Sequence, residues 1–228
     1  MAESDTRTDL DSRSSPDGPE ATARERKERK ANADRRRRQL IEATLRSVVR
    51  HGLARTTLAT VAREAGLSQG VAVFYFQTKQ GLFDAALRHA YRRYEANWMA
   101  ALETAGPRPA DRLLALLDAD FRPEVCSRDA LAVWFAFWGE LKTTDTYAAI
   151  AADFDARRFA VLRQTCLDLT GDADEAERLA GWIDTFCDGY WQRLYLFPKS
   201  HSPEEGRRAL RALLARLMPD RAPFDPPA

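Results

Sequence analysis

The chain has 228 residues, of which 45% are hydrophobic, so it is long enough for one or two globular domains with a substantial core. Its three cysteines show no paired spacing, which argues against a disulfide framework or a zinc site and predicts reduced core residues in a cytoplasmic protein. No apolar run approaches the length that a bilayer requires, and no hydrophobic leader precedes a cleavage site, so we expect no membrane partner.

Charge is distributed unevenly along the chain, although the net charge is only +1. Residues 1–20 carry 2 basic against 6 acidic side chains, residues 21–93 carry 17 against 6, and residues 94–228 carry 16 against 22. A strongly basic segment indicates a surface that binds phosphates, as in nucleic-acid recognition. The acidic remainder argues against nucleic-acid binding there.

Residues 1–32 are rich in charged residues, serine and proline, and contain almost no large apolar side chain. Such a segment cannot bury enough surface to offset the entropy of ordering, so we expect a disordered arm that gains a turn or two of helix when bound. Basic residues in and just after the arm, notably Arg35 and Arg36, could reach a DNA backbone or minor groove. The alternative is a solvated charge run.

Residues 33–80 carry the pattern of a three-helix domain that contains a helix-turn-helix. Thr57 suits the N-cap of a short helix, and Gly66 suits the left-handed conformation at which that helix ends. Ser68 is expected to cap the second helix of the motif, and Thr78 a third helix that runs on into the rest of the chain.

The helix that follows Ser68 is short, and a few residues near its end are enough to pack it on its neighbours. The side chains of Gln69, Val71 and Val73 are then left facing outward. Exposed valines fit the methyl groups of thymine in a DNA major groove, and Gln69 can pair with adenine or a phosphate. The alternative is an ordinary helical hairpin without a role in DNA binding.

Several features of residues 56–82 occur together: Thr56-Thr57, Val61-Ala62, the run 65–68, Gly70, Tyr75-Phe76, Lys79 and Leu82. As a set they resemble the DNA-binding domain of the tetracycline-repressor (TetR) family. The resemblance implies an all-α homodimer, with an N-terminal helix-turn-helix domain and a C-terminal helical bundle that binds a small effector and dimerises. It also implies a repressor of a palindromic operator on double-stranded DNA, with phosphate contacts from Thr57, Ser68, Tyr75 and Lys79.

Residues 81–220 show helical periodicity interrupted by glycine and proline. The expected helices cover about 79–103, 111–121, 127–141, 143–169, 172–197 and 203–218, and a frayed tail is expected at 221–228. The last two helices carry more apolar residues than one core face needs. The family resemblance implies that they form the dimer interface, and internal packing is the alternative.

Aromatic and acidic side chains concentrate in two segments of this C-terminal region. Trp134 and Trp138 share a face of one helix, while Tyr190 and Trp191 lie on another helix beside Asp188. Most aromatic stripes belong to a core, but ring faces combined with a carboxylate are also how a site holds a quaternary ammonium ion. These five residues are therefore the candidate ligand site.

The segments WFAFWGEL at 134–141, CDGYWQRL at 187–194 and DFRPE at 120–124 resemble a subfamily of choline-sensing repressors of the glycine-betaine pathway. This resemblance implies release from DNA by choline and control of genes for betaine synthesis or uptake. A TetR-type regulator of another metabolic or efflux operon, with a different effector, is the alternative.

An enzyme is the alternative of another class. Aspartates in D-x-D spacing at 118/120, 153/155 and 172/174 could suggest metal or acid–base chemistry. They lack a partnering histidine cluster, and no phosphate loop, nucleophile elbow or metalloprotease motif is present. We therefore predict no catalytic residue, no metal ligand and no cofactor. A structural or protein-interaction module would leave the basic third of the chain without a role.

Overall fold

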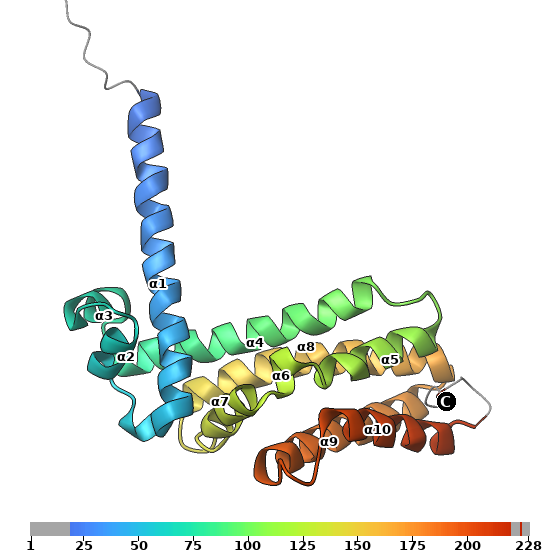
Figure 1. The fold of residues 1–228 in the computed structure, drawn as a ribbon. Coiled ribbons are helices and arrows are strands. Elements are labelled where there is room, and N and C mark those ends of the chain that lie inside the picture. The colour runs from blue at the N-terminus through green and yellow to red at the C-terminus, as the bar shows by residue number, and fades with distance from the viewer. Residues whose placement is uncertain (1–18, 220–223, 225–228) are drawn as a thin grey trace, which may run out of the picture. The chain divides into compact units, whose positions relative to one another are not determined.

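The computed structural model describes residues 19–219 and 224, with side chains from residue 23 onwards, and these residues contain helices and no strands (Figure 1). The prediction of an all-α chain is confirmed. The described helices are α1 (Pro19–Arg55), α2 (Leu58–Glu64), α3 (Gln69–Phe76), α4 (Lys79–Glu103), α5 (Pro109–Asp120), α6 (Pro123–Cys126), α7 (Arg128–Trp138), α8 (Asp145–Thr170), α9 (Ala173–Leu196) and α10 (Pro203–Leu217). None of them combines the length and the apolar character that a membrane span needs.

The chain divides into two compact units, one ending at Gln39 and the other beginning at Leu40. The helix α1 contributes to both, because it continues through this point. The predicted boundary between residues 80 and 81 falls inside the second unit, where α4 crosses it without a break.

The predicted disordered arm, 1–32, lies outside the described residues up to residue 18, but from residue 19 it forms the first turns of α1. Arg24 pairs with Glu28, and Arg29 with Glu25, each one helical turn apart on the exposed surface. Such pairs stabilise a helix by about 0.3–0.5 kcal/mol each. The expectation of disorder counted apolar burial alone and did not include these charged pairs.

The helix-turn-helix begins with a capping box at Thr57. The hydroxyl of Thr57 accepts from the backbone N–H of Thr60, and the Thr60 hydroxyl accepts from the N–H of Thr57, at 3.1 and 2.8 Å. Two of the unpaired donors at the start of α2 are thereby satisfied. The helix then ends near Gly66, whose φ of 66° lies in the left-handed region, as the sequence predicted.

Buried polar contacts fix the C-terminal part of α1 against α2. Thr56 is fully buried, and its hydroxyl lies 3.1 Å from that of Ser47 on α1. On the surface, Glu64 at the end of α2 pairs with both Arg46 and Arg50 of α1. These contacts set the orientation of α2, and α3 packs on α2 in turn through Ala72 and other buried side chains.

The helix α4 leaves the helix-turn-helix region and packs along α5 and α8, beside which it runs in Figure 1. Its N-cap, Thr78, accepts from the backbone N–H of Gly81 at 3.0 Å, which confirms the predicted cap. Near the same end, Gln80 and Asp84 hydrogen-bond to the hydroxyl of Thr146 at the start of α8. The start of α4 is thus fastened to α8.

The helices α8 and α9 form the most extensive pair of the second unit, and α10 packs on α9. The approach of α10 is close at Gly206, where an added Cβ would lie 2.5 Å from Phe121 and 2.7 Å from Tyr190. Of the predicted frayed tail, 221–228, only Phe224 is described, and its side chain is fully buried rather than loose.

Candidate DNA-binding surface and effector pocket

The outward face of α3 agrees only in part with the prediction. Gln69 and Val73 are exposed, as predicted, whereas Val71 is only half-exposed and packs against the core. Phe74, which the sequence analysis did not select, is 77% exposed and lies next to Val73. Ser68 occupies the N-cap position of α3, but its side chain makes no capping hydrogen bond.

The residues implied for phosphate contact lie around the ends of α2, α3 and α4. Thr57 and Ser68 are exposed N-caps, and Tyr75 is half-buried. Lys79 is exposed, yet its Nζ donates to the carbonyl oxygens of Leu53 and Ala54 at 3.1 and 3.4 Å. Lys79 therefore also satisfies backbone acceptors at the end of α1.

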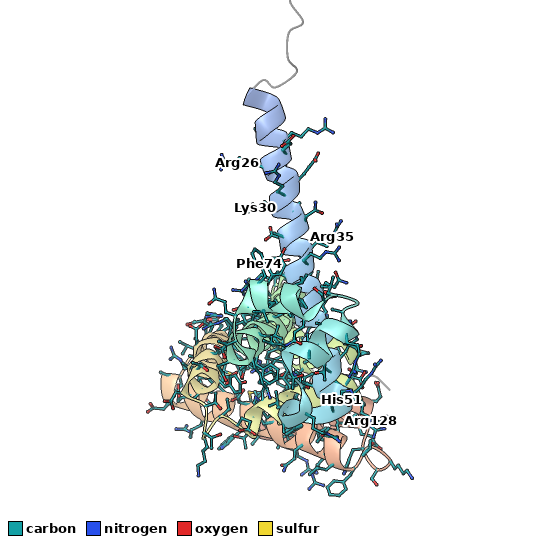
Figure 2. The ribbon with its side chains drawn as sticks, turned by 90° about the vertical axis from the view of Figure 1, so that its left-hand side faces the viewer. Arg26, Lys30, Arg35, His51, Phe74 and Arg128 are labelled. Carbon is teal, nitrogen blue, oxygen red and sulfur yellow. The ribbon has the colours of Figure 1, made fainter. Side chains whose placement is uncertain are left out.

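Arg35 and Arg36 lie in the first unit, on the part of α1 that ends at Gln39. Both are exposed; Arg35 donates to Asn32, and Arg36 donates to Gln39. Arg26, Lys30 and Arg35 project from this segment of the helix in Figure 2. Residues 23–31 of this segment form a highly charged helical surface, and all of their side chains are exposed.

A small cavity of about 110 Å³ lies between α4, α7, α8 and α9. Its lining residues are Tyr91, Tyr94, Trp134, Trp138, Asp155, Arg158, Asp184, Asp188 and Trp191. The planes of Trp134 and Trp138 are tilted by 23° and 15° from that of Trp191, with ring centroids 6.4 and 6.2 Å from it. Aromatic rings and carboxylates therefore line the same cavity. We call this cavity the aromatic pocket.

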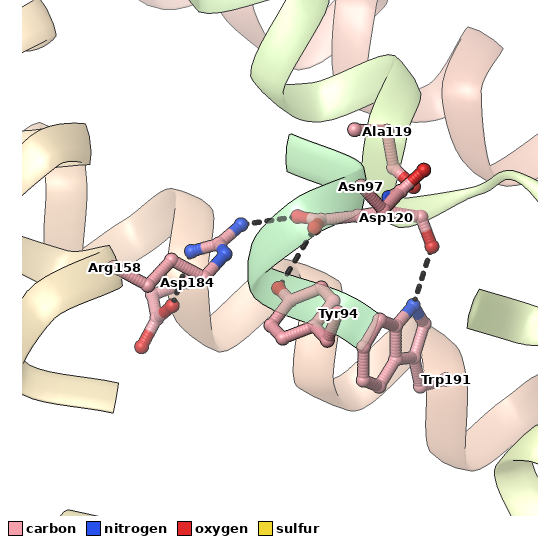
Figure 3. A network of polar contacts seen from close by, with 7 residues as sticks. All are labelled: Tyr94, Asn97, Ala119, Asp120, Arg158, Asp184 and Trp191. Atoms are coloured by element: carbon pink, nitrogen blue, oxygen red, sulfur yellow. Dashed lines mark hydrogen bonds and ion pairs between the residues drawn. The ribbon is translucent and has the colours of Figure 1, made fainter. Parts of the chain in front are cut away.

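A buried polar network anchors the pocket (Figure 3). The carboxylate of Asp120, which is fully buried, accepts from the hydroxyl of Tyr94 at 2.8 Å and pairs with the guanidinium of Arg158. Arg158 also donates to Asp184 at 3.1 Å. One guanidinium thus faces two carboxylates, while the pocket contains two further ones, Asp155 and Asp188.

Those two further carboxylates belong to exposed residues, unlike the fully buried Asp120. Partial removal from water, and then the nearby charge of Asp184, raise the pKa of Asp155 to about 6 and that of Asp188 to about 7. Both causes disfavour the ionised form. A bound cation would favour the ionised forms of both carboxyl groups and so offset these two causes.

Of the five residues predicted for the ligand site, the structure brings together Trp134, Trp138, Asp188 and Trp191. Tyr190 lies elsewhere: its ring stacks on Phe186 and contacts His201, beside a separate groove. Adjacent residues on a helix are about 100° apart, so Tyr190 and Trp191 cannot share a face.

The pocket also contains residues that the sequence analysis did not assign to the site, chiefly the tyrosines of α4 and the acid–arginine network. Tyr91 and Tyr94 are three residues apart, a spacing that indicates a shared face and could have been noticed. Nothing in the local sequence indicates that Asp120 meets Arg158, because the two are 38 residues apart and meet only through the packing of α5 on α8.

The all-helical fold with its helix-turn-helix places the chain in the class of helix-turn-helix regulators. Comparison of the sequence with known families agrees. Residues 40–86 match "Bacterial regulatory proteins, tetR family", and residues 109–219 match "BetI-type transcriptional repressor, C-terminal". The chain belongs to the TetR family of transcriptional regulators, with a BetI-type C-terminal domain. This membership sets the enzyme alternative aside.

Curated relatives and solved structures resemble most of the chain. The transcriptional regulator BetI of Stenotrophomonas maltophilia is 32% identical over 173 residues, covering 76% of this chain and 88% of that protein. BetI of Burkholderia mallei is 41% identical over 160 residues, covering 69% and 80%.

Two solved structures share the fold. A regulator from Pseudomonas aeruginosa has a TM-score of 0.74 at 26% identity, covering 82% of this chain and 92% of its own. A regulator from Saccharomonospora viridis, solved in complex with choline, has a TM-score of 0.71 at 21% identity, covering 78% and 94%.

Proposed function

We propose that this chain is a repressor that binds a palindromic operator as a homodimer and leaves it when a small organic cation, choline or a close relative, occupies the aromatic pocket. The observation that carries the effector is the composition of that pocket. Three indoles line it, and three lining carboxylates, those of Asp155, Asp184 and Asp188, share it with a single guanidinium that also pairs with the buried Asp120.

A quaternary ammonium ion matches this environment well. Its methyl groups pack on ring faces, whose quadrupole attracts the charge by about 0.5–2 kcal/mol for each well-placed ring. Asp155 and Asp188 are not paired with Arg158 in the structure and supply the balancing charge. The names of the curated relatives, and the choline bound to the Saccharomonospora viridis regulator, support this class of effector.

The DNA-binding roles rest on the helix-turn-helix. In this proposal Gln69 and Val73 read base edges, with a smaller part for the half-buried Val71. Thr57, Ser68, Tyr75 and Lys79 hold phosphates, and Arg35 and Arg36 add contacts from the preceding helix.

Dimerisation is assigned to α9 and α10. Trp182, Leu196, Phe197 and Leu217 on and around these helices are exposed by 52%, 53%, 55% and 38%. Several large apolar side chains exposed on one helix pair are typical of an interface surface. A C₂ dimer also matches the symmetry of an operator whose half-sites lie about 34–36 Å apart.

Coupling between the two sites runs through α4. Tyr91 and Tyr94 of α4 line the pocket, and the same helix begins at Lys79, two residues after the C-cap of α3. A ligand that shifts α4 relative to α7 and α9 therefore alters the position of α3. Release requires that the ligand prefer the state in which the two recognition helices no longer match the half-sites.

Calorimetry tests the effector. Choline, betaine aldehyde and glycine betaine are titrated beside 3,3-dimethylbutanol, a neutral analogue of choline in which carbon replaces nitrogen. At least one cation is expected to bind, with the neutral analogue much weaker. Trp138→Ala should lose about 0.5–2 kcal/mol of affinity, whereas Met99→Ala, at an exposed position outside the pocket, should lose none. If none of the three gives heat at millimolar concentration, another effector occupies the site, and binding to operator DNA is then tested separately.

A further inference from the structure

Phe74 is the most exposed large apolar side chain in the described part of the chain, at 77%. It lies in the middle of α3, the second helix of the helix-turn-helix, and carries a label in Figure 2. Its ring meets that of Tyr75 edge to face, with centroids 5.1 Å apart. That contact leaves most of the Phe74 ring in water, so packing within the chain does not account for it.

The neighbours of Phe74 form a surface that another molecule can approach closely. Gly70, Val73 and Phe74 are spaced to share one face of the helix, and all three are exposed. Beside Gly70 there is open space, since an added Cβ would meet only the hydroxyl of Ser68, at 3.8 Å. The first turn of α3 has no acidic side chain that would repel phosphates.

We propose that Phe74 packs against the 5-methyl group of a thymine in the major groove and so helps to determine which operator is bound. This rests on DNA binding by the helix-turn-helix. A phenyl ring has no hydrogen-bond donor or acceptor, so it cannot read the polar edges of guanine, cytosine or adenine. The thymine methyl is the apolar group that the major groove offers. Gly70, which lacks a side chain, lets the helix backbone come close enough for this contact.

The test removes one side of the contact at a time: the methyl group of thymine in the DNA, or the phenyl ring of Phe74 in the protein. Duplexes bound by the wild-type chain are first selected from a random pool, and each thymine of the selected site is then replaced singly by deoxyuridine. At one thymine per half-site, the wild type should lose about fourfold in affinity, the effect expected for one buried methyl group. Phe74→Ala should bind the thymine duplex at least fourfold more weakly and be insensitive to deoxyuridine at that position.

Two further variants sharpen the result. Phe74→Leu retains apolar bulk and should keep part of the sensitivity to deoxyuridine. Met99→Ala, at an exposed apolar position on α4, should leave both DNA affinity and the response at the Phe74 thymine unchanged. Circular dichroism confirms that each variant is folded, as expected for substitutions at exposed positions.

The proposal is overturned if no single deoxyuridine substitution weakens the wild type, or if Phe74→Ala retains the full deoxyuridine penalty. It is equally overturned if Phe74→Ala leaves DNA affinity intact but changes self-association, which would assign this ring to a protein contact. A wild type that selects no duplex at all would instead count against DNA binding itself.

Discussion

The indole Nε1 of Trp191 donates a 2.9 Å hydrogen bond to the backbone carbonyl oxygen of Asp120, 71 residues earlier in the chain. The side chain of Asp120 meanwhile accepts from Tyr94 and pairs with Arg158. Asp120 therefore links four helices around the aromatic pocket, namely α4, α5, α8 and α9 (Figure 3). The orientation of the Trp191 ring is fixed by the fold before any ligand arrives, and such preorganisation lowers the cost of binding.

Trp191→Phe should lower the free energy of unfolding by about 1–3 kcal/mol. The substitution retains an aromatic ring but removes the donor, so the carbonyl of Asp120 loses this partner in a buried environment. Urea denaturation measures the change. Met99→Leu is the control, since that side chain on α4 is 47% exposed, lies outside the proposed dimer interface and should change stability by less than about 0.5 kcal/mol. Equal effects of the two substitutions would contradict a structural role for the Trp191 donor.

Binding of choline should strengthen as the pH rises from about 5 to 8. The cation favours the ionised forms of Asp155 and Asp188, whose pKa values are raised to about 6 and about 7, so protons compete with it below these values. Affinity should rise by up to about tenfold per pH unit for each proton displaced and then level off. Asp188→Asn should weaken binding at pH 8 and flatten the profile. Asp174→Asn, at an exposed position in the first turn of α9, should do neither.

The same carboxylates predict that the stability of the ligand-free protein falls as the pH rises, whereas choline affinity rises. Because their pKa values are raised on folding, the native state holds more protons than the unfolded state between about pH 4 and 7. Their contribution to stability is therefore fully present below the unfolded pKa and is lost as the pH rises through 6 to 7. Thermal melting of wild type and Asp188→Asn across this range measures the effect. A profile for the Asn variant identical to that of the wild type would show that Asp188 does not titrate in this way.

Local signals in the sequence predicted the helix-turn-helix well. The caps at Thr57 and Thr78 and the left-handed Gly66 depend on a few neighbouring residues, and each has the predicted conformation. The long C-terminal helices also agree with the expected ranges to within two residues at most ends. Such features follow from capping chemistry and periodicity, which act over one or two turns.

The pocket could be predicted only in part. Trp134 and Trp138 share a face because they are four residues apart, and this local relationship held. Tyr190 was grouped with Trp191 because sequence proximity was given more weight than helical phase, whereas in the structure Tyr190 lines a separate groove. The network of Asp120, Arg158 and Asp184 depends on how α5, α8 and α9 pack, which no local pattern specifies. Phe74 was missed because its exposure follows from the orientation of α3.

Trp182→Glu combined with Leu217→Glu should convert a dimer into a monomer. Both side chains are exposed in the single chain, at 52% and 38%, so the charges should not disturb the fold of one subunit. In the proposed interface each glutamate would be buried without a partner, which is strongly unfavourable. Sedimentation measures the mass. Met99→Glu, an equally exposed apolar position on α4, is the control and should leave the assembly unchanged. A folded double variant that remains dimeric would place the interface elsewhere.

Lys79→Ala should weaken binding to all DNA sequences alike and reduce the slope of log affinity against log salt by about 1, as expected for one lost phosphate contact. The Lys79 ammonium already donates to Leu53 and Ala54 at the end of α1, so the substitution should also cost a little stability. Fluorescence anisotropy with specific and random duplexes at several salt concentrations measures both affinity and slope. Lys142→Ala, an exposed lysine between α7 and α8, should change neither.

The way in which Lys79→Ala changes DNA affinity, salt dependence and stability distinguishes three roles for this lysine. A phosphate contact lowers affinity for specific and random duplexes by the same factor, and its effect shrinks as salt rises. A purely structural role at the end of α1 would lower thermal stability but leave the salt slope unchanged. A role in base recognition would alter the preference between duplexes at constant salt slope. We expect the first pattern. A small drop in melting temperature should accompany it, because Lys79 at the start of α4 also donates to a backbone carbonyl group at the end of α1.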